Sequence, residues 1–213
     1  MFSRAMLPKA MIAKPAESGF KEPAAERLPP RERILVVARD LFYERGVRAV
    51  GVDEIAAAAG TNKMTLYRHF ASKDLLVAEC LRQVARQADA ELDRLAAAHP
   101  GNPRGELTAW LAAMTDHIVA AGGRGCALAN AAVELAEKDH PARKVIEEVK
   151  RAQRDRLVRL CRAAALEEPE FLADELFLLL EGARVSAQSV GRDGPAARLV
   201  RMGEAIIASH TPA

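Results

Sequence analysis

Residues 52–76 have the sequence VDEIAAAAGTNKMTLYRHFASKDLL, which predicts two short helices joined by a tight turn. The first helix ends at Gly60, a residue that favours turns. Thr61 or Asn62 can then cap the second helix, because short polar side chains accept hydrogen bonds from the first backbone amides of a helix. Two helices arranged in this way form a helix-turn-helix, whose second helix can enter the major groove of DNA.

The second of these helices is predicted to have one buried face and one exposed face. Leu66 and Phe70 fall on the side toward the first helix, so the opposite side points outward. A lysine can donate hydrogen bonds to guanine, and side-chain methyl groups can contact the methyl group of thymine. The candidates for base contacts are Lys63, Met64 and Thr65, and Arg68 lies on the same outward side. Each of them could instead contact only the DNA backbone or water.

The helix-turn-helix stretch follows a segment with clear helical periodicity. Residues 31–46, RERILVVARDLFYERG, place apolar residues at i, i+3, i+4 and i+7 and end at Gly46, a residue typical of helix C-termini. Residues 1–30 have no such pattern and contain five of the eleven prolines, so we expect a flexible arm there.

The remainder of the chain also has helical patterns, separated by glycine and proline stop signals. No segment alternates apolar and polar residues with the period of a strand, so the chain is predicted to be all-α. The predicted helices after the first cover residues 52–59, 63–70, 73–98, 104–121, 126–139, 142–166, 170–190 and 195–208.

The N-terminal motif contains Ile55-Ala56, Ala59-Gly60, Thr65-Leu66-Tyr67, His69-Phe70, Lys73 and Leu76 at fixed spacing. This pattern resembles the DNA-binding domain of the TetR/AcrR family of bacterial repressors. Gly51 stands where that family usually has a Ser or Thr cap, and Thr61 replaces a customary apolar residue. The resemblance implies a three-helix DNA-binding domain over residues 31–77, extending to about 91, with its motif at 54–73. It also implies a larger helical domain over residues 78–213 that binds an effector and forms a dimer.

The function implied by the resemblance is that of a ligand-responsive repressor. Such a protein binds a pseudopalindromic double-stranded DNA operator as a homodimer and is released by a small molecule. The resemblance implies that Tyr67 and His69 contact the DNA backbone. Lys73 lies in the first turn of a helix, where the helix dipole disfavours a cation unless a phosphate lies close by.

Several alternatives remain open at this stage. Lys73 could be a solvated lysine, Tyr67 a buried aromatic residue and His69 a histidine at the edge of the core. The whole chain could also be a helical scaffold that keeps the motif without binding an operator.

Three stripes in the C-terminal helices could line a small-molecule pocket, because such pockets combine apolar walls with a few converging polar groups. The segment 126–139 is apolar almost all round, so we expect it to be buried on both sides. The candidate lining residues are Trp110, Met114, His117, Cys126, Asn130, Glu134, Phe177, Glu181 and Arg184. The alternative is that Asn130 and Glu134 face water while Trp110 and Met114 belong to the core.

The last two predicted helices carry apolar stripes interrupted by small residues, a pattern typical of close helix–helix interfaces. We therefore predict that they pair with the same helices of a second copy. The predicted interface residues are Leu176, Leu180, Ala183, Leu199, Gly203 and Ile206. The alternative is that the stripe on the last helix is ordinary intramolecular core.

Composition excludes several other classes of protein. The 213 residues carry a net charge of only +2, and the first 75 residues hold 13 Lys and Arg against 9 Asp and Glu. The three cysteines lack the spacing of a disulfide framework or a zinc site, and no catalytic motif is present, so neither a metal, a cofactor nor an enzymatic activity is expected. No apolar run approaches the ~20 residues of a membrane span, and the N-terminus lacks the core of a signal peptide. We expect a cytoplasmic protein with no membrane partner.

Overall fold

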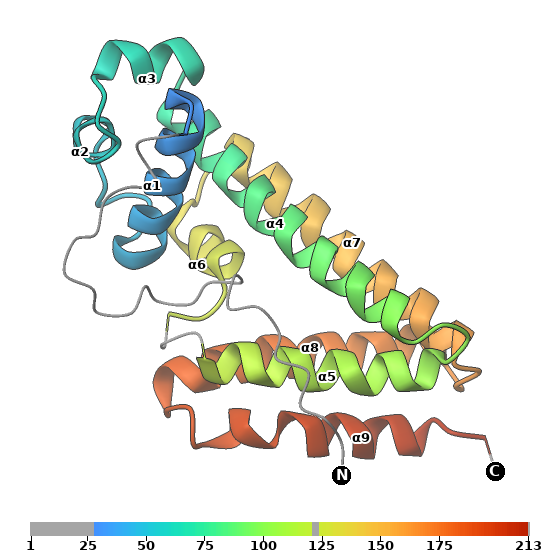
Figure 1. Ribbon diagram of the computed structural model, residues 1–213. Helices are drawn as coiled ribbons and strands as arrows, with labels where there is room; N and C mark the ends of the chain where they lie inside the picture. The colour runs from blue at the N-terminus through green and yellow to red at the C-terminus, as the bar shows by residue number, and fades with distance from the viewer. Residues whose placement is uncertain (1–27, 121–123, 213) are drawn as a thin grey trace. The chain divides into compact units, whose positions relative to one another are not determined.

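The fold of the chain is entirely helical in a computed structural model that describes residues 28–120 and 124–212 (Figure 1). The helices are α1 Pro30–Arg45, α2 Val52–Ala58, α3 Lys63–His69, α4 Lys73–Ala98, α5 Pro103–Ala120, α6 Ala127–Glu134, α7 Pro141–Ala163, α8 Pro169–Ser189, the 3₁₀ helix η2 Pro195–Arg198 and α9 Leu199–Ser209. The all-α prediction is confirmed. Most of the predicted arm, residues 1–27, lies outside the described residues, and Pro30 already begins α1.

The described residues divide into two compact units. The N-terminal unit comprises residues 28–86 and 126–149, and the C-terminal unit comprises residues 87–120, 124–125 and 150–212. The N-terminal unit therefore includes α6 and the first turns of α7 in addition to the three helices around the motif. This grouping differs from a simple division of the chain near residue 77.

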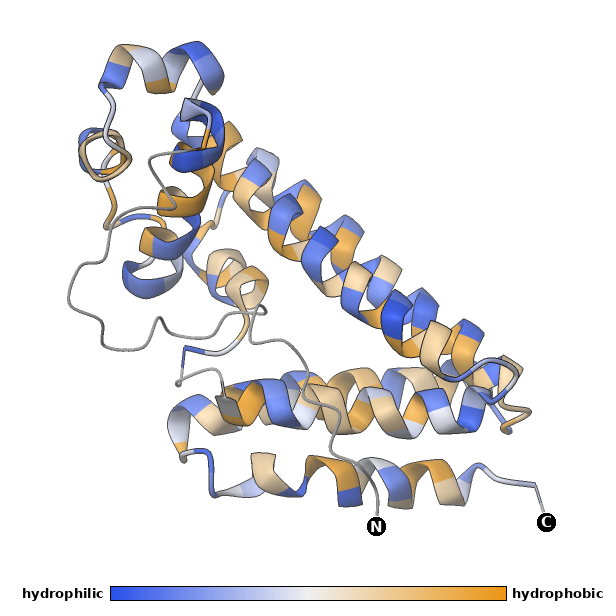
Figure 2. Cartoon of the chain, in the orientation of Figure 1, coloured by the Kyte–Doolittle hydropathy of each residue, from blue (hydrophilic) through white to orange (hydrophobic). Residues whose placement is uncertain are grey.

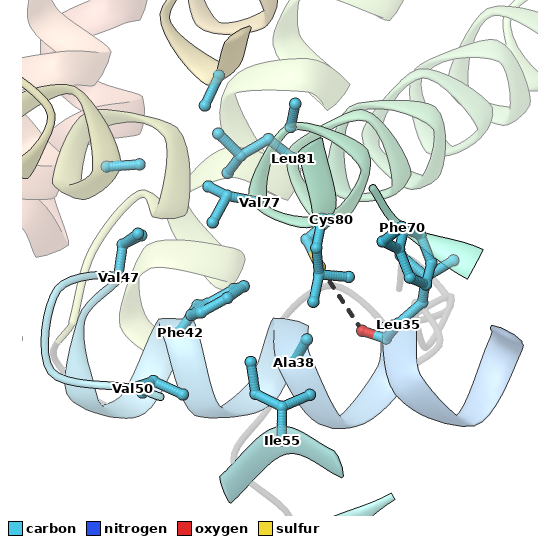
Figure 3. Packing of buried hydrophobic residues seen from close by; sticks show 14 of the residues in the cluster. Leu35, Ala38, Phe42, Val47, Val50, Ile55, Phe70, Val77, Cys80 and Leu81 are labelled. Atoms are coloured by element: carbon cyan, nitrogen blue, oxygen red, sulfur yellow. Dashed lines mark hydrogen bonds between the residues drawn. The ribbon is translucent and has the colours of Figure 1, made fainter. Parts of the chain in front are cut away.

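The core of the N-terminal unit forms where α1, α2, α3 and the start of α4 meet. Ile34 and Ala38 of α1 are fully buried against Ile55 of α2 and Leu66 of α3. Figure 3 shows the aromatic ring of Phe42 and the side chain of Ile55 in this core. These residues come from the i, i+3, i+4 positions of short helices, so burying one face of each helix fixes which residues remain on its other face.

The C-terminal unit is built on α5, α8 and α9, which lie side by side in Figure 1. Leu107 and Leu111 of α5, Leu172 and Leu176 of α8, and Leu199 of α9 are almost completely buried. In Figure 2 each helix carries hydrophilic as well as hydrophobic residues. No helix in the described ranges has both the length and the continuous hydrophobicity of a membrane span.

Two predicted helices differ from the structure. The helix predicted at 126–139 ends at Glu134, because Leu135 adopts extended backbone angles and its side chain enters the core of the N-terminal unit. Val133 on this helix is 86% exposed, so the expectation that the segment is buried on both sides is wrong. The helix predicted at 195–208 begins as a 3₁₀ turn, in which Ala196 is fully buried, before α9 starts at Leu199.

Candidate nucleic-acid interface and ligand pocket

The helix predicted to read DNA, α3, is held in place by a cap and by two buried side chains. The Asn62 side chain accepts a hydrogen bond from the Thr65 backbone amide at 2.9 Å, so Asn62 is the cap of the two candidates. Leu66 is fully buried, and Phe70 is almost so. The face of α3 opposite these two side chains is therefore left without cover from its own unit.

The exposed face of α3 carries most of the predicted DNA-contacting side chains. Met64 is 74% exposed and Tyr67 is 40% exposed. The exposed set is Lys63, Met64, Tyr67, Arg68 and His69, and the half-buried set is Thr65 and Lys73. The surface holds both cationic and apolar groups, which is the chemistry needed to contact phosphates and base edges.

Two lysines of this surface already have neighbours within the N-terminal unit. Lys63 Nζ lies 3.1 Å from Asp53 Oδ2 of α2, and both side chains are more than half exposed. Exposed ion pairs contribute at most ~1 kcal/mol, so Lys63 can exchange this carboxylate for another acceptor at low cost. Lys73 is the first residue of α4, and its ammonium lies 6.0 Å from the centre of the Phe42 ring of α1.

Arg33 of α1 is a positioning residue that the sequence pattern did not reveal. Its Nε donates to the Ala59 carbonyl at 3.0 Å, and its Nη2 donates to the Gly60 carbonyl at 3.4 Å. Both carbonyls belong to the turn between α2 and α3, so Arg33 fixes that turn against α1. A single arginine in an amphipathic helix carries no signal of such a contact, because its partners are 26 and 27 residues away.

Glu134, at the end of α6, acts within the N-terminal unit. Its Oε2 accepts a hydrogen bond from the Arg48 backbone amide at 3.1 Å. The chain turns there at Gly46, which has a φ of +89°, and a Cβ at Gly46 would lie 2.8 Å from the Glu134 carboxylate. Cys126 and Asn130 lie in the same unit. None of the three residues lines the apolar pocket described next, so their assignment to a ligand site stays a prediction.

That pocket is an apolar slot within the C-terminal unit. Its walls include Trp110 and Met114 of α5 and Phe177 of α8, and its polar lining includes Arg184, so four of the predicted residues are brought together. The other lining residues are Ala88, Leu92, Leu95, Glu106, Gln153, Arg156, Leu157, Leu160 and Leu180. The four lining residues that α7 contributes, among them Gln153 and Arg156, were absent from the prediction.

The two remaining pocket candidates adjoin the slot rather than line it. Glu181 bonds to Arg184 on the same helix and also accepts a 2.7 Å hydrogen bond from Lys150 Nζ. Burial, with a smaller contribution from the charge of Arg184, lowers the pKa of His117 to about 4. His117 is therefore neutral at neutral pH. The prediction that His117 and Glu181 line the pocket directly is not supported by the geometry.

The predicted dimer interface is largely internal to the chain. Leu176, Leu180, Ala183 and Leu199 are buried in the core of the C-terminal unit. Gly203 is buried against Leu111, so closely that a Cβ would lie 2.6 Å from Leu111 Cδ1. These five residues therefore have little surface left for a second copy, and their place in a dimer interface stays a prediction. Ile206 is half-buried and packs against the same core.

A different face of α8 is both apolar and exposed. Phe171, Leu178 and Val185 are 56%, 69% and 60% exposed, and they recur every seven residues along one side of the helix. Gly182 lies on the same side, and a Cβ there would meet no atom within 4 Å. We call these four residues the α8 stripe. Among the residues described, no group of His, Cys, Asp or Glu is arranged to hold a metal ion.

Both the sequence and the fold of the chain are similar to those of known proteins. Residues 34–80 match the sequence profile of bacterial regulatory proteins of the tetR family. The fold of 86% of the chain superposes on 96% of SCO4454, a TetR-family transcriptional regulator from Streptomyces coelicolor, with a TM-score of 0.80 and 26% sequence identity. Residues 34–80 thus match the sequence of this family, and the fold of the chain is that of a TetR-family regulator.

Sequence similarity to individual TetR-family regulators is confined to part of each chain. The match to the transcriptional activator FasR of Mycolicibacterium smegmatis is 43% identical over 83 residues, which is 34% of this chain and 38% of FasR. The match to the transcriptional repressor KstR2 of Rhodococcus jostii is 50% identical over 52 residues, which is 24% of this chain and 26% of KstR2. The chain thus matches well under half the length of these relatives.

Proposed function

We propose that this protein is a TetR-family transcriptional regulator that binds a pseudopalindromic DNA operator as a homodimer and is released by a small molecule. The observation that carries the proposal is the face of α3. Buried Leu66 and Phe70 fix the helix in its unit, and the opposite face presents Lys63, Met64 and Tyr67 to solvent. We propose that Lys63, Met64 and Thr65 contact base edges, with Arg68 beside them, and that Tyr67, His69 and Lys73 contact phosphates.

The α8 stripe supports the homodimer. Large exposed apolar side chains in a row mark interaction sites more often than they mark surfaces in contact with water. The glycine in the row permits close approach of a second helix, and a twofold axis would bring the same stripe of another copy onto it. We propose this stripe, in place of the buried residues first predicted, as the centre of the dimer interface.

The dimer matters because operator reading needs two copies of α3. A dimer with twofold symmetry contacts two operator half-sites whose centres are about 34–36 Å apart, the length of one turn of DNA. A ligand in the slot would favour a dimer geometry with a different separation, and operator affinity would fall by linkage. We propose repression as the result of operator occupancy. KstR2 is named a repressor and FasR an activator, so the relatives include both outcomes.

A binding experiment separates base contacts from phosphate contacts. Replacing Lys63 with alanine is expected to cost ~1–3 kcal/mol at particular base pairs while non-specific affinity stays nearly unchanged. Replacing Lys73 with alanine is expected to weaken binding to all sequences and to lower the slope of log affinity against log salt by about one per subunit. The measurement is fluorescence anisotropy with the DNA flanking the protein's own gene, a scrambled duplex and a salt series.

Lys144→Ala is the matched control, because Lys144 is an exposed lysine of the same unit outside α3 and α4. It is expected to bind like the unmodified protein. If the wild-type chain binds flanking and scrambled DNA equally, the proposed function is wrong. If Lys63→Ala weakens both duplexes equally, the assignment of Lys63 to a base contact is wrong.

A further inference from the structure

The slot in the C-terminal unit has two chemically different ends. Near one end, Arg104 of α5 donates to the Ala164 carbonyl after α7 at 3.0 Å. Near the other, Lys150 of α7 bonds to Glu181 of α8 at 2.7 Å. Glu106 lies two residues after Arg104 on α5, toward the first end, and Arg184 lies three residues after Glu181 on α8, toward the second.

The Arg184 end is rich in positive charge. Arg184 lines the slot with its side chain only 14% exposed. The carboxylate of Glu181 is shared between Arg184 and Lys150, so Arg184 does not hold this acceptor alone. The positive charge of Arg184 also contributes to the lowered pKa of the neighbouring His117.

A second arginine of the slot, Arg156 of α7, has only a weak acidic partner. Its Nη1 lies 2.7 Å from Asp93, whose side chain is 72% exposed and therefore well screened by water. The only acidic residue in the lining is Glu106, toward the opposite end. The lining therefore favours an anion near Arg184 and disfavours a cation there.

The rest of the slot is apolar and narrow. Trp110, Met114 and Phe177 line it together with leucines from α4, α7 and α8. Its cavity volume is about 50 Å³. A slender apolar chain fits such a space once flexible side chains such as Met114 move aside. A highly charged ligand would lose its hydration among these walls without enough partners to replace it.

From these features we infer that the slot takes an apolar monocarboxylic acid, with its carboxylate on Arg184 and its hydrocarbon part between Trp110 and Phe177. A guanidinium can bind a carboxylate through two parallel hydrogen bonds, which compensates the carboxylate for lost water. The inference deepens the proposed function, because it names the chemical class of the effector of that function.

The experiment uses the tryptophan of the slot as its reporter. Trp110 is the only tryptophan of the chain, so its fluorescence reports occupancy without a label. The full-length protein is titrated at pH 7.5, without DNA, with three probes of one tail length: decanoate, decan-1-ol and decyltrimethylammonium. Decanoate is expected to bind about ten- to a hundredfold more tightly than decan-1-ol, and the cation is expected to bind more weakly than either. Equal affinity for acid and alcohol, tighter binding of the cation, or no response to decanoate would overturn the inference.

Variants locate the carboxylate. Arg184→Gln is expected to lower decanoate affinity about ten- to a hundredfold and to leave decan-1-ol affinity unchanged, whereas exposed Arg159→Gln on α7 is expected to change neither. Arg184→Lys keeps the charge but not the paired hydrogen bonds, so a smaller loss is expected. Glu181→Gln removes the competing carboxylate and is expected to raise decanoate affinity severalfold. Loss of affinity for both acid and alcohol in Arg184→Gln, or unchanged decanoate affinity in both Arg184→Gln and Glu181→Gln, would overturn the assignment.

The DNA experiments described above are independent of these titrations. If the chain binds decanoate through Arg184 but binds flanking and scrambled DNA equally, the ligand class is supported and the proposed function is wrong. If the chain binds its operator but binds decan-1-ol more tightly than decanoate, the proposed function is supported and the ligand class is wrong.

Discussion

Replacing Gly203 with glutamate is expected to unfold the C-terminal unit rather than to separate two subunits. Gly203 of α9 is buried against α5, where even a Cβ would lie 2.6 Å from Leu111 Cδ1. Leu111 is itself 1% exposed and belongs to the core, so it has little room to move. Overpacking and the burial of a carboxylate without a partner act together, at a cost of about 4 kcal/mol or more.

Thermal unfolding followed by circular dichroism measures this effect. Ala205→Glu places the same charge two residues further along α9, at an exposed position, and is expected to change stability by less than ~0.5 kcal/mol. A Gly203→Glu protein that melts like the unmodified chain but elutes as a monomer would show that Gly203 lies between subunits, as its small size and spacing first suggested.

Replacing Leu178 with glutamate is expected to have the opposite outcome: a folded monomer that no longer binds its operator. Leu178 is 69% exposed, so its substitution removes nothing from the core of the chain. In the proposed dimer, however, the new carboxylate would be buried between two copies of the α8 stripe. Burial of an unpaired charge costs ~3–5 kcal/mol, which lowers the dimerisation constant at least about a hundredfold. Operator affinity would fall with it, because a monomer retains only one recognition helix.

Sedimentation or light scattering, together with operator binding, tests this prediction. Val190→Glu is the matched control, since Val190 is also exposed and apolar but is the cap residue just after α8, about a third of a turn away from Leu178 around the helix axis. It is expected to remain a dimer. A Leu178→Glu protein that stays dimeric and binds the operator normally would place the dimer interface elsewhere.

The N-terminal unit could be predicted closely from the sequence because its helices are short and their faces are unambiguous. The i, i+3, i+4 spacing of apolar residues determines which side of a short helix is buried, and Leu66 and Phe70 lie where that spacing places them. The choice between Thr61 and Asn62 as the cap needed backbone geometry. The contact of Arg33 with the turn between α2 and α3 could not be predicted, since it joins residues with no local pattern in common.

The C-terminal unit was less predictable because an apolar stripe does not identify what covers it. On α8 the buried stripe through Leu176 and Leu180 packs against its own chain, while the stripe through Phe171, Leu178 and Val185 is exposed. Both have helical periodicity, so sequence alone favoured the more apolar one as the interface. The early end of α6 also could not be predicted. It places Leu135 in the core of the N-terminal unit, and Glu134 accepts a hydrogen bond from the Arg48 backbone amide.

The central claim is that the exposed face of α3 reads DNA sequence in a twofold-symmetric complex. Selection from a pool of random duplex DNA by the full-length protein tests it most directly. The expected result is a pseudopalindromic site whose half-sites are centred about one helical turn, or a multiple of it, apart. Met64→Ala and Lys63→Ala are expected to change the bases recovered at equivalent positions in both half-sites. A pool that shows no enriched sequence after repeated rounds, or variants that recover the same site as the unmodified protein, would contradict the account.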